Sequence, residues 1–264
     1  MRAKRSLGQN FLVDESVVDR IVSAAGVRAG DTVVEIGPGR GALTAGLRAL
    51  ARNYICIEKD DALAAQLAEQ FAGDDSSFVV NDDALTMMPS GLPLPGPYRV
   101  VANLPYNVGG RITMHLLENW PGQVTSATLM FQREVADRLA AVPSTKAYGA
   151  LSVLVQSMAE VWPLFGVPPG AFRPVPKVQS RVVRLQPRAE PLWAGLDYER
   201  FRTVIHGGFQ SRRKTLLNSL ANATTLTNDV DLIRAAVAEA GLDGGDRPDH
   251  ISVAGWVALT RALG

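Results

Sequence analysis

The 264-residue sequence predicts an α/β protein in which a Rossmann-like parallel sheet is followed by a small helical domain. Short β-branched runs alternate with helical patterns through the first half of the chain, which is typical of βαβ units. A glycine-rich turn joins the first of these runs to its helix, and four amphipathic segments follow one another near the C-terminus. The predicted domains are residues 1–189 and residues 190–264.

The predicted sheet begins with four strands that are separated by helices or loops. We expect strands over residues 31–36, 53–58, 77–80 and 99–102, and helices over residues 42–51 and 61–71. Residues 89–97 contain four prolines and two glycines, a composition typical of a surface loop.

The rest of the chain contains two more predicted strands and several helices. Strands are expected over residues 126–131 and 181–185, and helices over residues 110–117, 134–139, 197–209, 212–220, 229–240 and 253–263. An apolar pattern continues over residues 151–158. The proline-rich residues 167–176 are expected to form a rigid, extended segment, because proline fixes the backbone and lacks an amide hydrogen.

Composition limits the class of protein. Hydrophobic residues make up 47% of the chain, enough for a large core, and the longest wholly apolar runs are too short to span a membrane. We therefore expect a soluble, cytoplasmic protein with no membrane partner. We also expect it to be a monomer. The single cysteine, Cys56, lies in an apolar run and is predicted to be a buried strand residue. The three histidines lack metal-ligand spacing, so no metal site is expected.

Charge is distributed unevenly along the chain. The formal charge is +1 over residues 1–20, −4 over residues 21–172 and +4 over residues 173–264. Residues 173–214 alone carry ten basic and three acidic side chains, which favours a partner with phosphates. Within them Arg212, Arg213 and Lys214 are three adjacent cations near a helix start, and we expect them to bind RNA phosphates. A solvated basic face is the alternative.

A glycine-rich segment at residues 35–41, Glu-Ile-Gly-Pro-Gly-Arg-Gly, follows the first strand and opens a helix. Gly37 and Gly39 allow a tight turn and let a ligand approach bare backbone at the helix N-terminus. A nicotinamide-binding loop reads G-x-G-x-x-G, and Ala42 occupies its third glycine position here. The G-x-G-x-G spacing suits a methyltransferase better.

Acidic residues end the next two strands. Glu58 lies twenty-one residues after Gly37, where a carboxylate can accept hydrogen bonds from both ribose hydroxyls of a nucleoside. Asp82 and Asp83 follow the third strand, where a carboxylate can accept a hydrogen from an adenine amine. The glycine loop and the two strand-end acids together predict S-adenosyl-L-methionine as the cofactor.

The fourth strand is followed directly by Asn103-Leu-Pro-Tyr106. An adenine amine is a poor nucleophile, because its lone pair is delocalised into the ring. The Asn103 side-chain oxygen and a backbone carbonyl of this turn can hold both amine hydrogens and favour a pyramidal nitrogen. Tyr106 offers a face on which a flipped adenine can stack. Phe172, between prolines, is a candidate second stacking face, and a buried core position is the alternative.

These motifs, in this order, resemble the ribosomal RNA adenine dimethyltransferase family, and specifically its bacterial small-subunit branch. The similarity extends over nearly the whole chain. It includes Ser6-Leu-Gly-Gln-Asn-Phe-Leu12, Glu35-Ile-Gly-Pro-Gly39, Asn103-Leu-Pro-Tyr-Asn107, Gln132-Arg-Glu-Val-Ala136, Lys146-Ala-Tyr-Gly149, Leu151-Ser-Val153, Phe172-Arg-Pro-Val-Pro176, Ser180-Arg-Val-Val-Arg-Leu185 and Gln210-Ser-Arg-Arg-Lys-Thr-Leu216.

The resemblance implies a class I methyltransferase domain with a helical C-terminal domain. It implies that the substrate is two adjacent adenosines in the 3′-terminal hairpin of 16S rRNA, within the small ribosomal subunit or its precursor. It implies cofactor contacts by Asn10, Leu12, Gly37, Glu58, Asp83 and Asn103. Around the target base it implies roles for Asn103, Leu104, Tyr106 and Phe172. The roles of Asn10 and Leu12 depend on the resemblance alone.

The sequence departs from the family pattern at Val108-Gly-Gly-Arg111, where a Ser/Thr-Pro helix start is usual, and at Ser211 and Leu217.

Three other functions are alternatives to dimethylation of small-subunit rRNA. The related resistance enzymes modify large-subunit rRNA by the same chemistry, but Leu7-Gly-Gln-Asn10 and Leu151-Ser-Val153 favour the small-subunit branch. A non-catalytic ribosome-assembly factor is disfavoured by the intact cofactor residues. A nicotinamide oxidoreductase is the most distant alternative.

Overall fold

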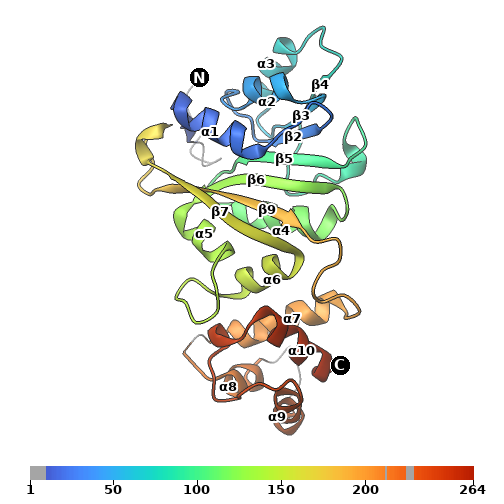
Figure 1. The fold of residues 1–264 in the computed structure, drawn as a ribbon, viewed down its shortest axis with the longest axis vertical. Helices are drawn as coiled ribbons and strands as arrows, with labels where there is room; N and C mark the ends of the chain where they lie inside the picture. The colour runs from blue at the N-terminus through green and yellow to red at the C-terminus, as the bar shows by residue number, and fades with distance from the viewer. Residues whose placement is uncertain (1–9, 212, 224–228) are drawn as a thin grey trace. The chain divides into compact units, whose positions relative to one another are not determined.

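The structure is a computed structural model that describes residues 10–211, 213–223 and 229–264 (Figure 1). These residues form two compact units. The first contains the described residues up to Ala136 together with Glu160–Pro187, and the second contains Asp137–Ala159 and Arg188–Gly264. The helical domain was predicted to begin at residue 190. The second unit resumes close to that boundary but also includes an earlier part of the chain.

The earlier part belongs to the second unit through helix α6 (Ala150–Met158), which packs against α7 (Tyr198–Phe209) and α10 (Val253–Leu263). The Tyr148 hydroxyl donates to the carbonyl oxygen of Ile251 at 2.9 Å. A single boundary along the sequence does not capture this unit, because the chain enters it, leaves it and returns.

The first unit is built on a sheet with seven strands among the described residues, in the order β4-β3-β2-β5-β6-β9-β7. Strands β4, β3, β2, β5 and β6 pair in parallel, and β9 pairs antiparallel with β6. The strands are β2 (Thr32–Ile36), β3 (Asn53–Ile57), β4 (Ser77–Val80), β5 (Tyr98–Asn103), β6 (Val124–Gln132), β7 (Ala159–Val167) and β9 (Ser180–Pro187). The predicted α/β class is confirmed.

The helices of this unit lie close to their predicted ranges. They are α2 (Thr44–Leu50), α3 (Asp61–Gln70), α4 (Gly109–Asn119) and α5 (Arg133–Leu139), whose last residues belong to the second unit. Three elements were not predicted, namely α1 (Glu15–Ala25), β1 (Phe11–Leu12) and β7. The proline-rich segment contains β8 (Phe172–Arg173), which pairs antiparallel with β1.

One hydrophobic cluster packs α1 and α2 against a single face of the sheet. Directly paired residues point to the same side, and the register pairs Val33 with Tyr54 and Glu35 with both Cys56 and Val101. The cluster also contains Met130 and Val182 from β6 and β9. Cys56 is fully buried, which confirms its prediction as a buried strand residue.

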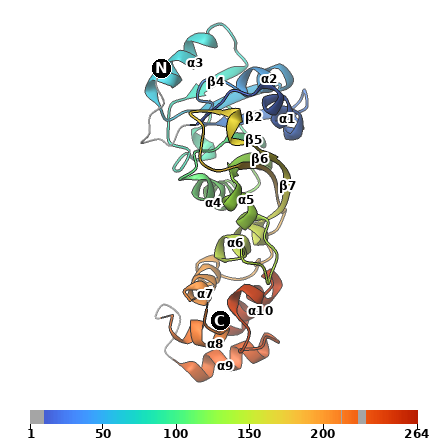
Figure 2. The ribbon, with the colours of Figure 1, turned by 90° about the vertical axis from the view of Figure 1, so that its left-hand side faces the viewer.

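In the second unit, α7 is followed along the chain by α8 (Leu216–Ala221), α9 (Val230–Glu239) and α10 (Figure 2). Each of these four helices begins after a side chain that accepts a hydrogen bond from a first-turn amide, which satisfies a donor that the helix leaves unpaired. These caps are Asp197, Thr215, Asp229 and Ser252. Helix α8 was predicted over residues 212–220, and the Thr215 cap explains its later start. None of the described helices is long and apolar enough to cross a membrane.

Candidate active site

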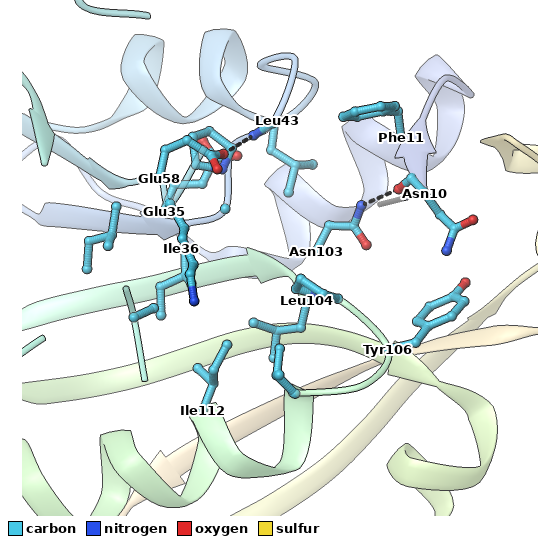
Figure 3. Close-up of a pocket in the computed structure, with 18 of the residues that line it drawn as sticks. Asn10, Phe11, Glu35, Ile36, Leu43, Glu58, Asn103, Leu104, Tyr106 and Ile112 are labelled. Atoms are coloured by element: carbon cyan, nitrogen blue, oxygen red, sulfur yellow. Dashed lines mark hydrogen bonds between the residues drawn. The ribbon is translucent and has the colours of Figure 1, made fainter. Parts of the chain in front are cut away.

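A cavity lies at the carboxyl ends of β2, β3 and β5 (Figure 3). From β2 the sheet extends to β3 and β4 on one side, and to β5 and β6 on the other. Open α/β sheets bind ligands at such a switch point, because the connections diverge there and leave a crevice. The predicted residues that line the cavity are Asn10, Leu12, Gly37, Gly39, Glu58, Asp83, Asn103, Leu104 and Tyr106.

The glycine loop after β2 has the backbone conformation that its sequence predicts. Gly37 and Gly39 have φ angles of 64° and 59°, in the left-handed region that a Cβ disfavours. The Gly37 amide donates to the carbonyl oxygen of Ile57 at 2.9 Å, which ties the loop to the end of β3. The loop therefore presents bare backbone to the cavity.

Glu58 is 6% exposed, and both of its carboxylate oxygens accept backbone hydrogen bonds. Its Oε2 accepts from the Gly39 amide at 3.0 Å, and its Oε1 accepts from the Asp60 amide at 2.9 Å. Each carboxylate oxygen can accept more than one hydrogen bond, so ribose hydroxyls can share these acceptors. The two amides hold the carboxylate in a fixed orientation at the cavity wall.

Asp83 is bound by a neighbouring cation. Lys59 Nζ lies 2.7 Å from its Oδ2, and the Leu85 amide donates to its Oδ1 at 3.0 Å. Burial opposes ionisation of Asp83, but these hydrogen bonds outweigh it and hold the pKa of the carboxyl below its ordinary value. Asp83 is therefore an anion, with lone pairs left to accept a hydrogen from an adenine amine.

Asn103 is the last residue of β5, and Leu104 follows it into the turn. The Asn103 Nδ2 donates to the carbonyl oxygen of Asn10 at 3.3 Å, and the Leu104 amide donates to the carbonyl oxygen of Met130 at 3.2 Å. Figure 3 shows the Asn103 oxygen on the side of the amide that faces away from Asn10. The turn is thus held from the N-terminal strand and from β6.

Tyr106 is half-buried at the edge of the cavity, and its hydroxyl lies 2.8 Å from Ser180 Oγ. Burial raises the pKa of Tyr106, so its phenol is neutral at physiological pH. The contact with Ser180 links the turn after β5 to the start of β9. It fixes the position of the ring from its hydroxyl end.

Phe172 does not line the cavity, contrary to its prediction as a second stacking face. Its side chain is fully buried in the hydrophobic cluster, and Phe172 pairs with Leu12 between β8 and β1. The prolines around it do make the segment rigid, but the pairing directs the ring into the core. The alternative of a core phenylalanine is the one that the structure supports.

Within the departure at Val108-Gly-Gly-Arg111, Gly109 has a local steric explanation. Helix α4 begins at Gly109 without a side-chain cap on Val108. A Cβ on Gly109 would lie 2.9 Å from Phe131 Cδ1, closer than such atoms approach. Glycine therefore accommodates the Phe131 ring beneath the helix start.

A buried polar cluster beside the glycine loop was not predicted. Glu35 Oε2 accepts hydrogen bonds from the Tyr54 hydroxyl at 2.5 Å and from Thr44 Oγ1 at 2.9 Å. Burial raises the pKa of Glu35 to about 7, although these two hydrogen bonds oppose the effect, and the nearby Glu58 carboxylate raises it further. The register of β2 and β3 places Tyr54 on the same face of the sheet as Glu35. The cluster could therefore be recognised only after the pairing of these two strands was known.

Phe11 and Arg40 also line the cavity and were not assigned a role from the sequence. The Arg40 guanidinium carbon lies 4.4 Å from the centroid of the Phe11 ring. Phe11 lies in β1, between Asn10 and Leu12, and the pairing of β1 with β8 was needed to place it.

Two of the three cations predicted to bind RNA are described in the second unit. Arg213 and Lys214 are exposed in the turn between α7 and α8. Arg212 lies outside the described residues. The exposure of the two described side chains is compatible with phosphate binding and with a solvated face.

The sequence matches the model of the family described as "Ribosomal RNA adenine dimethylase" over residues 1–243. The "Ribosomal RNA small subunit methyltransferase A" of Geobacter sulfurreducens is 40% identical over 269 residues, which cover 100% of this chain and 96% of that protein.

Two solved structures extend the comparison. The 23S rRNA methyltransferase ErmE is 31% identical with a TM-score of 0.72, and the match covers 96% of this chain and 99% of ErmE. A dimethyladenosine transferase from Plasmodium falciparum is 22% identical with a TM-score of 0.77, covering 94% and 95% of the two chains, and it supports the fold alone.

Proposed function

The chain belongs to the ribosomal RNA adenine dimethylase family, and from this premise we propose that its substrate is the small-subunit rRNA. The chain is an S-adenosylmethionine-dependent rRNA adenine dimethyltransferase. The proposed target is two adjacent adenosines of the 3′-terminal hairpin of 16S rRNA, each methylated twice at N6. One observation supports this chemistry above the others: the turn that begins at Asn103 lines the same cavity as the glycine loop and Glu58.

The residues of the cavity fit the cofactor. Gly37 and Gly39 allow a close approach to backbone, and Glu58 and Asp83 present acceptors for ribose hydroxyls and an adenine amine. Asn10 and Leu12 would complete the contacts from the N-terminal strand. When bound, S-adenosylmethionine supplies an electrophilic methyl group on a positively charged sulfur.

The turn of residues 103–106 would orient the target amine. Asn103 Oδ1 and a backbone carbonyl of the turn, next to Leu104, would accept the two amine hydrogens. Holding both hydrogens favours a pyramidal nitrogen whose lone pair points at the methyl group. Transfer of the methyl group would break its bond to sulfur, leave the cofactor as a neutral thioether and make the nitrogen strongly acidic. The proton of that nitrogen would then pass to water, so no side chain would be required as a general base.

The RNA would be held in two ways. A flipped adenine would stack on the Tyr106 ring, whose hydroxyl is fixed by Ser180. Arg212, Arg213 and Lys214 would pair with phosphates of the RNA. We assign no stacking role to Phe172, because its ring is fully buried.

The choice of rRNA is supported by the relative named for the small subunit, which is 40% identical along its length. The 31% identity to ErmE makes large-subunit rRNA the second candidate. Incubation with labelled S-adenosylmethionine and separate small and large subunits, followed by mapping of the modified base, distinguishes the two. Label in the small-subunit hairpin is expected, and label only in the large-subunit RNA would replace this proposal with the second.

We also propose that the protein acts as a monomer in the cytoplasm, on the small subunit or its precursor. The proposed substrate supports this location, because ribosomal subunits are assembled there in bacteria. Sedimentation of the free protein would test the monomer, with a single species of about 28 kDa expected from the chain mass of 28.3 kDa.

A further inference from the structure

The orientation of the Asn103 amide is set by the N-terminal strand. Its Nδ2 donates to the carbonyl oxygen of Asn10 at 3.3 Å, and Figure 3 shows the side-chain oxygen on the opposite side. An amide nitrogen only donates and an amide oxygen only accepts. With Nδ2 engaged by Asn10, the oxygen is left for the hydrogens of a target amine. A rotation of the amide by half a turn would place a donor against those hydrogens.

The carbonyl of Asn10 is in turn held by its neighbours. Phe11 and Leu12 form β1, which pairs with β8, and the Val13 amide donates to the carbonyl oxygen of Ala171 at 2.8 Å. Leu12 is buried in the hydrophobic cluster. These contacts fix the strand against β8 and the hydrophobic cluster.

Phe11 fixes the strand on the side of the glycine loop. Its Cε1 lies 3.3 Å from the place that a Cβ on Gly39 would occupy, so the ring packs on the bare backbone of that glycine. The Arg40 guanidinium carbon lies over the same ring, 4.4 Å from its centroid. The Phe11 ring thus contacts both the backbone of Gly39 and the guanidinium of Arg40.

We propose that Phe11 is a positioning residue for methyl transfer: held by its contacts with Gly39 and Arg40, it keeps the Asn10 carbonyl against Asn103 Nδ2 and so keeps Asn103 Oδ1 directed at the target amine. The proposal rests on the proposed role of Asn103. A Phe11 that served only as a wall for the cofactor would affect cofactor affinity but not the orientation of Asn103. The two roles therefore differ in their effect on turnover at saturating cofactor.

The test compares Phe11→Leu with Phe165→Leu, a matched control. The Phe165 ring also lies beneath an arginine, with Arg20 Cζ 4.1 Å from its centroid, but Phe165 is not among the residues that line the cavity. At saturating S-adenosylmethionine and RNA, Phe11→Leu is expected to lower the single-turnover rate by about 10-fold, the scale of a modest misplacement of a reacting group. The single-turnover rate of Phe165→Leu is expected to stay within about twofold of the wild-type rate. Phe11→Tyr keeps the aromatic face and should retain most of the wild-type rate.

A double-mutant cycle tests whether Phe11 acts through Asn103. In the Asn103→Ala background, Phe11→Leu is expected to cause no further loss of rate, because the amide that it orients is absent. The proposal would be overturned if the rate losses of the two single variants multiplied in the double variant. It would also be overturned if Phe11→Leu kept the wild-type turnover and only bound the cofactor more weakly by calorimetry. A normal rate in Asn103→Ala alone would instead overturn the proposed function of Asn103 itself.

A readout without turnover is available from the side-chain amide signals of Asn103 in ¹⁵N-labelled protein, assigned by their loss in Asn103→Ala. Phe11→Leu is expected to shift these signals in the cofactor-free protein, and Phe165→Leu is expected to leave them unchanged. Unchanged signals in Phe11→Leu would overturn the proposal.

Discussion

Glu58 and Asn103 each use part of their hydrogen-bonding capacity to hold the chain and leave the rest to a ligand. The Glu58 oxygens accept the Gly39 and Asp60 amides, and Asn103 donates to Asn10. A side chain that is held in this way loses little freedom when the ligand arrives, which favours tight binding or correct orientation. The geometry of the site is therefore determined before the cofactor and the RNA bind.

Glu58→Ala is expected to weaken S-adenosylmethionine binding by about 1.5–3 kcal/mol, the scale of hydrogen bonds to a charged group, and to leave the fold intact. Glu58→Gln, which keeps one oxygen acceptor, should lose less. Isothermal titration calorimetry measures both. Equal affinity in the wild type and Glu58→Ala would show that the carboxylate does not contact the ribose.

Asn103→Ala is expected to lower kcat by roughly 10²–10³-fold, as for the loss of one preorganised polar contact, with RNA affinity nearly unchanged. Because Asn103 also lines the cofactor cavity, cofactor affinity must be measured beside turnover. Single-turnover assays at saturating cofactor separate the two effects. Near-normal dimethylation by this variant would exclude the amide as the group that orients the amine.

Tyr106→Ala should impair capture of the flipped adenine as well as turnover, since stacking is worth on the order of 1–3 kcal/mol per base. Tyr106→Phe keeps the ring and loses only the contact with Ser180, so it should bind RNA almost as well as the wild type. RNA affinity and kcat for both variants provide the comparison. A similar loss of RNA affinity in the two variants would indicate that the hydroxyl, rather than the ring face, matters.

At the level of elements, the parallel strands could be predicted because each is a short β-branched run that is buried in the sheet. The edge strand β7 was missed because it contains Pro163 and Gly166, residues that disfavour central strands and are tolerated at edges. Helix α1 had a readable signal, since Asp14 caps it and Val17, Ile21 and Ala25 form its buried stripe. It follows a segment that otherwise resembles a loop.

The chain between α7 and α8 is predicted to bind RNA phosphates through its basic side chains. Replacing Arg212, Arg213 and Lys214 with Ala should lower the magnitude of the log–log salt slope of RNA binding by up to about 2–3, if each cation pairs with one phosphate. Arg234→Ala is a suitable control, because its guanidinium pairs with Asp231 within α9 at 2.6 Å. A slope equal to that of the wild type would assign the three cations to a solvated face.

At the level of the molecule, the sequence predicted the site residues that end parallel strands and missed those placed by contacts between distant segments. The carboxyl ends of neighbouring strands must meet at one edge of the sheet, so Gly37, Glu58 and Asn103 could be brought together from order alone. Phe11 depends on the pairing of β1 with β8, and the burial of Phe172 depends on the same pairing. Such pairings of distant segments leave no periodic signal in the sequence.

The buried Glu35 cluster connects the site to the stability of the whole molecule. Burial raises the folded-state pKa of Glu35 from 4.5 to about 7, so between these values the folded protein binds more protons at this group than the unfolded chain does. The contribution of Glu35 to folding therefore falls as pH rises through this window. Above pH 7 the folded protein must keep a carboxylate buried, at a cost on the order of 3 kcal/mol.

Glu35→Gln should remove this cost and keep an oxygen that accepts from the Tyr54 and Thr44 hydroxyls. We expect the variant to match the wild type near pH 4.5 and to exceed its free energy of unfolding by up to about 3 kcal/mol at pH 8. Urea unfolding of the cofactor-free protein across this range measures the difference, and Glu69→Gln on the exposed side of α3 should change it by less than about 0.5 kcal/mol. A difference that does not vary with pH would mean that folding leaves the pKa of Glu35 unshifted, because linkage requires any shift in its pKa on folding to appear as a slope.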